Sequence, residues 1–394
     1  MAPLSQEEKD DLVDRVHQAL SKTPYDCSSL THLTNGTTNF VFRGKLVRPI
    51  RGDGESTVTT TTVIVKHSLE HAALNKNLAI DTSRSLYEER MLDALSDFPS
   101  SVTGVQAPRL YLFIRESNIQ VLEDFPTAID LKSVFVSPDR NQFITVPELA
   151  SLSHDIGAWL RSFHDWSTSS NTKLQDFGDN EPMRKLKYAI TYGAYLKVLE
   201  TDFPDLLEGH REDLQQVKET AGKEFERTSK DEYVDKNWGF IHGDFWTGNI
   251  LIPTDLLPPD SQHPVERKLF IVDWEFTQFG HRAYDLGQMI GDIYERWLFG
   301  GVDGAIPAIE GFIEGYGQLE DEDLAYRIAI HAGVHIIGWY IRRAPNSPLL
   351  FPLAQVREAM RTGRDWIEKG WQRDVDFFKS TPLASLFSQK RKAQ

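Results

Sequence analysis

Two short apolar runs with polar, oxygen-bearing side chains at their ends constrain the fold of this chain more than any other feature. The first run, Asn249–Ile252, follows a loop that contains Asp244. The second run, Leu269–Val272, is followed at once by Asp273 and then by Glu275. Runs of this length and composition predict β-strands, and two such strands joined by a loop predict a hairpin. The hairpin would bring the polar residues of both segments to one of its ends.

The polar residues of this hairpin have the chemistry of a phosphoryl-transfer site. A carboxylate such as Asp244 can accept the proton of a hydroxyl, and Gly243 before it permits backbone angles that aim the side chain. Asn249 and Asp273 offer the oxygen ligands that Mg²⁺ prefers. Glu275 would point the same way as Asp273 in an extended segment and would then share the metal. The alternatives are turn caps at Asp244 and Asn249 and a surface ion pair at Glu275, but the combined spacing favours catalysis.

The composition indicates an ordinary globular chain. Its 394 residues, of which 40% are hydrophobic and 26% charged, suffice for two lobes with their own cores. The net charge of −15 argues against a nucleic-acid partner or an anionic membrane. The single Cys27 excludes an internal disulfide. No run approaches the ~20 apolar residues of a membrane span, so we expect a cytoplasmic protein, either a monomer or a homodimer.

Strand-like segments dominate the first third of the chain. Ser5 and the apolar spacing that follows it predict a capped helix over Gln6–Ser21. A second helix is expected over Arg84–Leu95, and a hairpin around Glu116–Asn118. The other strands are expected at Leu30–Leu33, Asn39–Val47 and Thr57–Lys66.

Helical periodicity dominates the chain after Phe125, apart from the hairpin of Asp244. We therefore predict an α+β, protein-kinase-like fold with two lobes. Residues 1–126 would form a small strand-rich N-terminal lobe, with a nucleotide-binding sheet and one inserted helix, and residues 127–394 a larger helical C-terminal lobe with the catalytic hairpin. The expected helices are Pro147–Trp166, Glu181–Glu200, Pro204–Thr228, Arg282–Arg296, Asp323–Arg343 and Leu353–Trp371.

Lys66 is an unusual charge at the end of the apolar strand Val63–Lys66. A lysine there needs an anionic partner or must reach water. Glu88 is the candidate partner, because its spacing from Leu92 and Leu95 places it on the packed side of its helix, whereas Glu89 turns away. The pair would then hold nucleotide phosphates. The polar loop before this strand is a weak phosphate cradle with one glycine; it contains Asn35, Gly36, Thr37 and Asn39.

Together these motifs resemble the aminoglycoside phosphotransferase and choline kinase superfamily, over about Leu30–Trp371. The shared motifs are the VIVKHS strand, the RSLYE helix start, the DFWTGN loop and the DWE motif. Within the superfamily the chain looks most like methylthioribose kinases and the fungal hydroxytryptamine kinase of psilocybin biosynthesis. The resemblance implies a two-lobed kinase fold that uses ATP and Mg²⁺.

The resemblance also implies roles for single residues. Asp244 would be the catalytic base, and Lys66 with Glu88 would position the nucleotide phosphates. The hinge between the lobes would be Leu122–Phe125, whose backbone would pair with adenine. Asn249, Asp273 and Glu275 would attend Mg²⁺, Glu123 and Phe125 would line the nucleotide, and His242 and Asp285 would brace the catalytic loop.

A departure from the methylthioribose kinases concerns the acceptor. Those enzymes carry an arginine pair in a late helix after an Ala-Gly step, but here Gly338-Trp339 stands at that offset after Ala332-Gly333. Arg342-Arg343 come about one turn later. An aromatic wall of Trp246 and Trp339 with His335 would suit a cyclic or cationic acceptor. A packed core is the equal alternative for these residues.

The spacing after the metal motif excludes a protein acceptor. Eleven residues separate Asp273 from Asp285, which leaves no room for a long activation segment. We therefore expect a kinase that transfers the γ-phosphate of ATP to a hydroxyl of a small metabolite. The alternatives are a choline- or methylthioribose-type kinase, a catalytically silent nucleotide-binding regulator of the same fold, and a metal-dependent phosphohydrolase.

Overall fold

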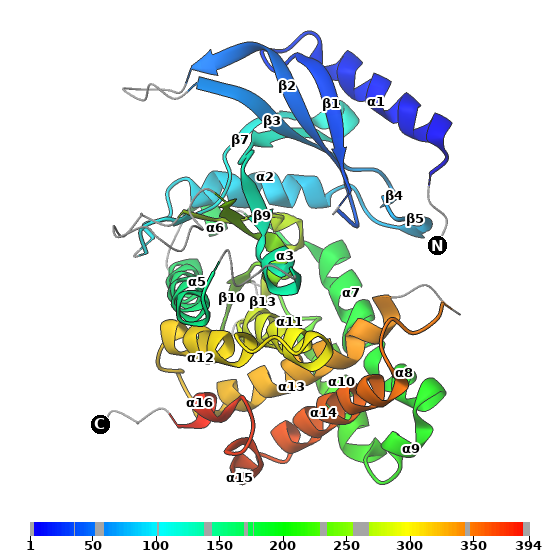
Figure 1. Cartoon of the computed structure of the whole chain (residues 1–394), viewed down its shortest axis with the longest axis vertical. Helices are drawn as coiled ribbons and strands as arrows, with labels where there is room; N and C mark the ends of the chain where they lie inside the picture. The colour runs from blue at the N-terminus through cyan, green and yellow to red at the C-terminus, as the bar shows by residue number, and fades with distance from the viewer. Residues whose placement is uncertain are drawn as a thin grey trace. The chain divides into compact units, whose positions relative to one another are not determined.

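The computed structural model describes residues 4–34, 36–51, 59–100, 102–137, 144–168, 172–175, 177–228, 235–254, 268–342 and 347–388. The chain divides into two compact units (Figure 1). The first comprises Met1–Asp97 and Ala107–Thr127, and the second Phe98–Gln106 and Ala128–Gln394. Strands form most of the first unit and helices most of the second, so the predicted α+β class is confirmed.

The first unit is built on a five-stranded antiparallel sheet. A helix, α1 (Gln6–Leu20), begins at a capping box between Ser5 and Glu8 and buries Leu12 and Val16 against one face of the sheet. Because these apolar residues face the sheet, the polar residues of α1 lie on the opposite side of the helix. In sheet order the strands are β1 (Cys27–Leu33), β2 (Phe40–Arg51), β3 (Thr59–His67), β8 (Ile119–Glu123) and β7 (Leu110–Ile114).

Successive side chains of β3 point to opposite faces of the sheet, so its buried valines and its lysine lie on different faces. Val63 and Val65 are fully buried in the cluster beneath α1. Because successive side chains of a strand point to opposite faces, Lys66 faces the other way, towards α2 (Arg84–Leu95). A short hairpin of β4 (His71–Ala72) and β5 (Asn75–Ala79) lies between β3 and α2 in the chain and was not predicted.

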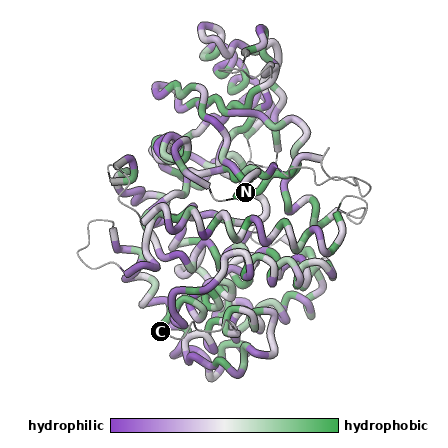
Figure 2. Tube along the Cα trace, turned by 90° about the vertical axis from the view of Figure 1, so that its left-hand side faces the viewer, coloured by the Kyte–Doolittle hydropathy of each residue, from purple (hydrophilic) through white to green (hydrophobic). Residues whose placement is uncertain are grey.

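The second unit is mainly helical, and hydrophobic and hydrophilic segments alternate along its helices (Figure 2). Glycines bring α5 (Val146–Ser167) and α12 (Ala305–Tyr316) close together: a Cβ at Gly315 would lie 1.9 Å from the His154 carbonyl oxygen. The remaining elements include α3 (Leu131–Val136), α6 (Thr172–Gln175), α7 (Glu181–Ile190), α8 (Tyr195–Asp202), α9 (Pro204–Leu207), α10 (Arg211–Glu224), α11 (Ala283–Gly300), α13 (Glu322–Gly338), η5 (Trp339–Arg342), α14 (Leu353–Trp371), α15 (Val375–Phe378) and α16 (Ala384–Phe387).

Three helix predictions were wrong in extent. The helix predicted over Glu181–Glu200 breaks between α7 and α8, where Thr191 leaves helical geometry with φ −117° and ψ −98°. The segment Pro204–Thr228 divides into α9 and α10. The last helix of the three, α13, ends at Gly338, and Arg343 lies outside the described residues.

The hairpin predicted to follow the Asp244 loop is present in the second unit. Strands β11 (Ile250–Pro253) and β12 (Leu269–Ile271) are antiparallel, with Ile250 opposite Ile271. Their sheet has the order β6-β12-β11-β9, with β6 (Val105–Gln106) and β9 (Ala128–Asp130) at its edges. A separate ribbon pairs β10 (Trp238–Ile241) with β13 (Gln278–His281). The loop of Asp244 therefore begins at the end of β10 and finishes at the start of β11.

Candidate active site

Lys66 and Glu88 form a buried ion pair in the first unit. The ammonium of Lys66 donates to both carboxylate oxygens of Glu88, at 2.9 and 2.8 Å. Lys66 is 5% exposed and Glu88 2%. The neighbouring Glu89 instead binds Arg115 at 2.7 Å in a more exposed position. The predicted preference for Glu88 over Glu89 is therefore confirmed, and it arises from the packed side of α2.

The polar loop, which lies between β1 and β2, is fastened to α2 by the side chain of Asn39. Its oxygen accepts hydrogen bonds from Ser68 Oγ at 2.8 Å and from the Arg84 guanidinium at 2.9 Å. Asn39 is 2% exposed. The backbone oxygen of Thr37 accepts from Leu74 N in the β4–β5 turn. Gly36 is described with its loop, whereas Asn35 lies outside the described residues.

The segment predicted as the hinge, Leu122–Phe125, includes the last two residues of β8 and continues past its end. The carboxylate of Glu123 accepts a hydrogen bond from Arg109 N at 3.1 Å. Asp124 forms an ion pair with Arg43 at 2.9 Å, which ties the segment to β2. Phe125 is half-buried. These contacts hold the segment at the end of β8, in the sheet that also contains Lys66.

The loop of Asp244 depends on a glycine. Gly243 has φ +81°, and a Cβ there would lie 2.2 Å from the Phe276 carbonyl oxygen. Any side chain would therefore be strained and would also collide with the backbone. This turn leaves the side chain of Asp244 half-buried at the end of β10.

Two amides hold the carboxylate of Asp244, one on each oxygen. Gln288 Nε2 donates to Oδ1 at 2.6 Å. Asn249 Nδ2 donates to Oδ2 at 3.3 Å and to the Asp244 carbonyl oxygen at 2.9 Å. Gln288 in turn accepts a hydrogen bond from the ammonium of Lys187, which is 3% exposed. The carboxylate is thus oriented from both sides.

Asn249 and Asp273 lie side by side at the ends of adjacent strands. Val272 N donates to the Asn249 carbonyl oxygen at 3.0 Å, and Asp273 follows directly. An amide oxygen and a carboxylate from these two residues form a donor set that fits Mg²⁺. Asp273 has φ +68° and ψ +61°, and Trp274–Phe276 forms a 3₁₀-helix.

The backbone at Asp273 removes the reason for predicting that Glu275 points the same way as Asp273. The period-two rule placed Glu275 on the same side as Asp273, but that rule applies only to extended chain. The left-handed backbone at Asp273 ends the strand, so alternation cannot relate the two side chains. Glu275 is fully buried, and its carbonyl oxygen accepts a hydrogen bond from Asn180 at 2.9 Å.

Asp285 clamps the start of the catalytic loop. Its Oδ2 accepts from His242 N at 2.8 Å and lies 3.1 Å from His164 Nε2, and its Oδ1 accepts from Gly243 N at 2.9 Å. Burial alone would raise the pKa of Asp285, but its hydrogen-bond donors and charged neighbours bring the pKa below its usual value. Asp285 therefore stays ionised inside the protein.

His242 is a second brace. Its Nε2 lies 3.0 Å from the Val272 carbonyl oxygen, and its Nδ1 accepts from Asp244 N at 3.2 Å. Because a carbonyl can only accept, Nε2 carries the proton and the ring is neutral. Burial, which disfavours the charged ring, lowers the pKa of His242. The imidazole thus links Asp244 to the segment that follows β12.

Helix α11 contacts the catalytic loop in sequence order along one face. Asp285 binds the backbone of the first two loop residues, and Gln288 binds Asp244. Asp292 accepts from Thr247 N at 3.3 Å and from the Thr247 hydroxyl. These three residues of α11 are three and four positions apart, which is the spacing of one helical face.

Trp246 lies folded against its own loop. A Cβ at Gly248 would lie 2.4 Å from the Trp246 indole, so only glycine lets the ring approach the backbone this closely. The ammonium of Lys132 lies 5.4 Å from the centre of the ring, over its face. The indole and this cation form one wall beside the loop.

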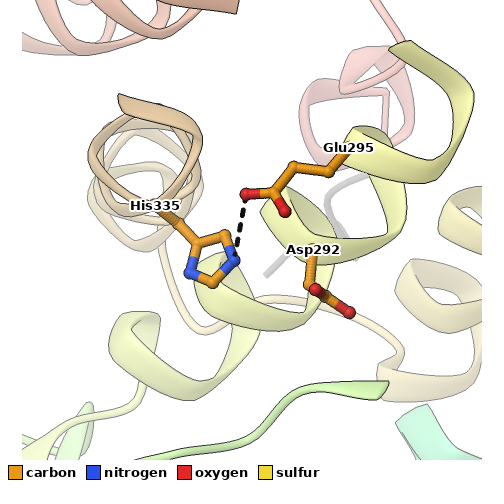
Figure 3. Close-up of side chains that lie close together, drawn as sticks. All are labelled: Asp292, Glu295 and His335. Atoms are coloured by element: carbon orange, nitrogen blue, oxygen red, sulfur yellow. Dashed lines mark ion pairs between the residues drawn. The ribbon is translucent and has the colours of Figure 1, made fainter. Parts of the chain in front are cut away.

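A buried charged cluster follows on α11 and α13. Figure 3 shows Asp292, Glu295 and His335 close together, with an ion-pair distance of 3.5 Å between His335 Nε2 and Glu295 Oε1. Two arginines are also present: Arg296 pairs with Asp292, and Arg342 donates to the His335 ring at 2.9 Å. These guanidiniums, with Thr247 on Asp292, already supply the positive charge and donors that a metal ion would bring.

Glu295 is the least satisfied member of this cluster. Its Oε1 accepts no hydrogen bond from the described residues, and Arg342 lies 3.8 Å from Oε2. Burial raises the pKa of Glu295 to about 8. Burial also lowers the pKa of His335 well below its usual value. At neutral pH the pair is therefore largely uncharged.

Trp339 packs away from this charged cluster in a group of aromatic rings. Its ring centre lies 4.5 Å from that of Phe299 and 5.6 Å from that of Phe351. His335 and Trp339, which were predicted as acceptor contacts, thus lie in two different surroundings.

Within the described ranges, no helix is both long and apolar enough to cross a membrane.

Comparison with known proteins decides the family. The model of the phosphotransferase enzyme family matches residues 81–326, which is more than half of the chain. The chain belongs to this family. The match includes Glu88, the Asp244 loop, Asp273 and the first part of α13, whereas Lys66, Asn39, His335 and Trp339 lie outside it.

Individual relatives agree with this family. The phosphotransferase FrzJ of Cladobotryum sp is 29% identical, over 97% of this chain and 98% of the relative. The 4-hydroxytryptamine kinase of Psilocybe cubensis is 22% identical, over 80% of this chain and 81% of the relative. Among solved structures, the amicoumacin kinase hAmiN, in complex with AMP-PNP and Ca²⁺, has a TM-score of 0.54 at 11% identity, over 93% of this chain and 96% of that one. That structure supports the fold alone.

Several residues of the site escaped the sequence analysis. Gln288 had a weak signal, because it is a polar residue in the long buried stretch of α11. Lys187 had none, because a lysine in an amphipathic helix usually faces water. His164 and Asp292 likewise lie far in sequence from the residues that they contact.

Proposed function

We propose that this member of the phosphotransferase family is an ATP- and Mg²⁺-dependent kinase that phosphorylates a hydroxyl of a small molecule. The observation that carries the proposal is the Asp244 carboxylate. It is oriented on both oxygens by amide donors, at 2.6 Å from Gln288 and 3.3 Å from Asn249. Such preorganisation suits a base that must meet a hydroxyl in one geometry.

In this proposal Asp244 accepts the proton of the acceptor hydroxyl while the oxygen attacks the γ-phosphorus of ATP in line. The bond from that phosphorus to the β,γ-bridging oxygen breaks, and ADP leaves. Asn249 and Asp273 would hold Mg²⁺, which when bound neutralises phosphate charge. Asp285 and His242 keep the loop in place through the contacts described above. Glu275 remains a candidate metal ligand.

The first unit would bind the nucleotide. Lys66, held by Glu88, has an ammonium suited to phosphate oxygens. The backbone of Glu123–Phe125 would pair with adenine, and Gly36 and Thr37 would cover the phosphates. Asn39 would act by holding this loop, because its side-chain oxygen is engaged by Ser68 and Arg84.

The acceptor class is supported by one relative and by one wall of the site. One relative is named as a kinase of 4-hydroxytryptamine, an aromatic amine with a hydroxyl. Trp246 offers an aromatic face in the catalytic loop, and His335 and Trp339 are further candidate contacts. A hydroxylated aromatic or amine metabolite is therefore the first class to test.

The test is ATP turnover with a panel of hydroxy-indoles, phenolic amines, amino-alcohols, sugars and aminoglycosides. We expect a phosphorylated product with at least one class, and no product after chelation of Mg²⁺. Asp244→Asn should lower kcat roughly 10²–10⁴-fold without changing the melting temperature. Nucleotide binding with no turnover on any acceptor would instead support a silent regulator. Phosphate release from a phosphorylated metabolite without ATP would indicate a hydrolase.

A further inference from the structure

A buried lysine stands behind the candidate base. Lys187, on α7, is 3% exposed, and its ammonium donates to the side-chain oxygen of Gln288. Gln288 is 5% exposed and passes a 2.6 Å hydrogen bond on to Asp244 Oδ1. Burying an ammonium costs free energy unless it is paired. Three side chains from three separate segments of the second unit therefore form one chain of hydrogen bonds that ends on the base.

The two ends of this chain determine how the amide in the middle is oriented. An ammonium can only donate hydrogen bonds, and an ionised carboxylate can only accept them. The oxygen of the Gln288 amide must therefore face Lys187, and its nitrogen must face Asp244. With Lys187 absent, only Asp244 would orient the amide, and the Gln288 oxygen would lose the donor that holds the far end of the side chain.

We propose that Lys187 is a positioning residue for phosphoryl transfer: it locks the Gln288 amide so that Gln288 and Asn249 together hold the two oxygens of Asp244. The inference rests on the proposed function, because it concerns the base of that reaction. A fixed carboxylate keeps its remaining lone pairs aimed at the incoming hydroxyl. Misplacing a catalytic group by about 1 Å can cost roughly 10²-fold in rate.

Other charged groups also change the pKa of Lys187, so the test should leave those groups unaltered. Burial lowers the pKa of Lys187, whereas Asp244 and Asp285 raise it and Arg342 lowers it. On α13, His331 and His335 both have a pKa lowered by burial and further by Lys187. Variants should therefore be confined to Lys187 and Gln288, which form the hydrogen-bond chain itself.

The experiment is a double-mutant cycle in the full chain with ATP and an accepted substrate. Lys187→Met should lower kcat about 10–100-fold with little change in the KM for ATP. Gln288→Met should lower kcat at least as much, and the double variant should be no worse than Gln288→Met.

Two controls separate positioning from folding. Lys185→Met removes an exposed lysine from the same helix, whose side chain is 75% exposed, and should leave kcat unchanged. Lys187→Arg keeps a donor for Gln288 and should recover most of the activity. The melting temperature of Lys187→Met should equal or exceed that of the parent, because a buried charge is replaced by an apolar group.

Three outcomes would overturn the proposal. If Lys187→Met keeps the parental kcat while Asp244→Asn is inactive, Lys187 has no positioning role and the proposed function still stands. Losses that multiply in the double variant would show that Lys187 and Gln288 act independently. Full activity in Asp244→Asn would instead overturn the proposed function itself. If Lys187→Met does not fold, the same decision rests on Gln288→Met and Lys187→Arg.

Discussion

Two carboxylates on α11 are equally hidden from water and yet behave in opposite ways. Asp285, in the first turn of the helix, is 0% exposed, and Glu295, near its other end, is 2% exposed. Hydrogen bonds from the His242 and Gly243 backbone and from His164 bring the pKa of Asp285 below its usual value. Glu295 has one oxygen that accepts no hydrogen bond from the described residues, and burial raises its pKa to about 8.

The difference lies in the donors, not in the burial. Asp285 lies at a helix N-terminus, where partial positive charge favours an anion, and three donors converge on it. In contrast, the guanidiniums of Arg342 and Arg296 lie 3.8 and 3.9 Å from Oε2 of Glu295, beyond hydrogen-bond distance. A buried carboxylate thus works as a permanent anion only where the chain brings donors to it. Asp285, near the start of α11, thus holds the loop as a permanent anion, whereas Glu295, further along the helix, titrates near neutral pH.

Removing the clamp should have the largest effect. Asp285→Ala leaves the His242 and Gly243 amides and His164 without their acceptor, which should cost about 3–5 kcal/mol of stability. The catalytic loop should loosen, so kcat should fall more than 100-fold in any sample that folds. Urea denaturation and kcat measure both. A stable, fully active Asp285→Ala would show that the clamp is dispensable.

Gly243→Ala should disturb the same Asp285 contacts through the backbone of the loop. At φ +81° and 2.2 Å from the Phe276 carbonyl oxygen, an added Cβ must move Gly243 N away from Asp285. We expect a loss of about 2 kcal/mol, with kcat reduced at least tenfold. Gly301→Ala, where φ is +58° and nothing lies within 4 Å of the new Cβ, is the matched control. Equal stability losses in the two variants would mean that strain alone, and not the collision, sets the cost.

Glu295 should make stability depend on pH. The folded protein keeps a proton that the unfolded chain releases near pH 4.5, so the free energy of unfolding should decrease as pH rises from about 4.5 to about 8. Glu295→Gln mimics the protonated acid and should flatten that decrease, by about 1 kcal/mol or more between pH 5 and pH 8. Asp285 contributes in a separate window, because its stabilisation is lost only as pH falls below about 4. Parallel curves for Glu295→Gln and the parent would contradict the assignment.

Arg342 should have the smallest effect. It lowers the pKa of Glu295 from 3.8 Å away, and its side chain is 45% exposed. Arg342→Gln should therefore extend the pH-dependent loss of stability to slightly higher pH, by less than about 1 kcal/mol. Arg361→Gln, which removes a 46% exposed arginine from α14, is the control and should leave the curve unchanged. The measurement is again urea denaturation across pH 5–9.

The sequence predicted elements well where one local pattern decides them. α2 and α14 have the predicted bounds, and the Asp244 hairpin follows from two apolar runs. α12 was missed because its sequence includes Pro307, Gly311 and Gly315, which are weak helix formers. Its helix depends on packing against α5, which no local pattern contains.

The candidate site divides in the same way. The motif residues of the catalytic loop can be found from their spacing alone. The residues that orient them come from distant segments, as Lys187 and Gln288 do for Asp244, and their contacts arise only in the folded chain. The prediction for Glu275 was argued from strand alternation, and it lost that support when Asp273 adopted a left-handed backbone.

The ordered contacts between α11 and the catalytic loop have a consequence for insertions and deletions. Because each residue advances an α-helix by about 100°, one residue inserted after Asp285 would turn Gln288 and Asp292 off the loop together. Asp244 and Thr247 would lose their partners in one step, although no contacting residue had changed. This helix should therefore tolerate substitutions on its other faces far better than any change in its length.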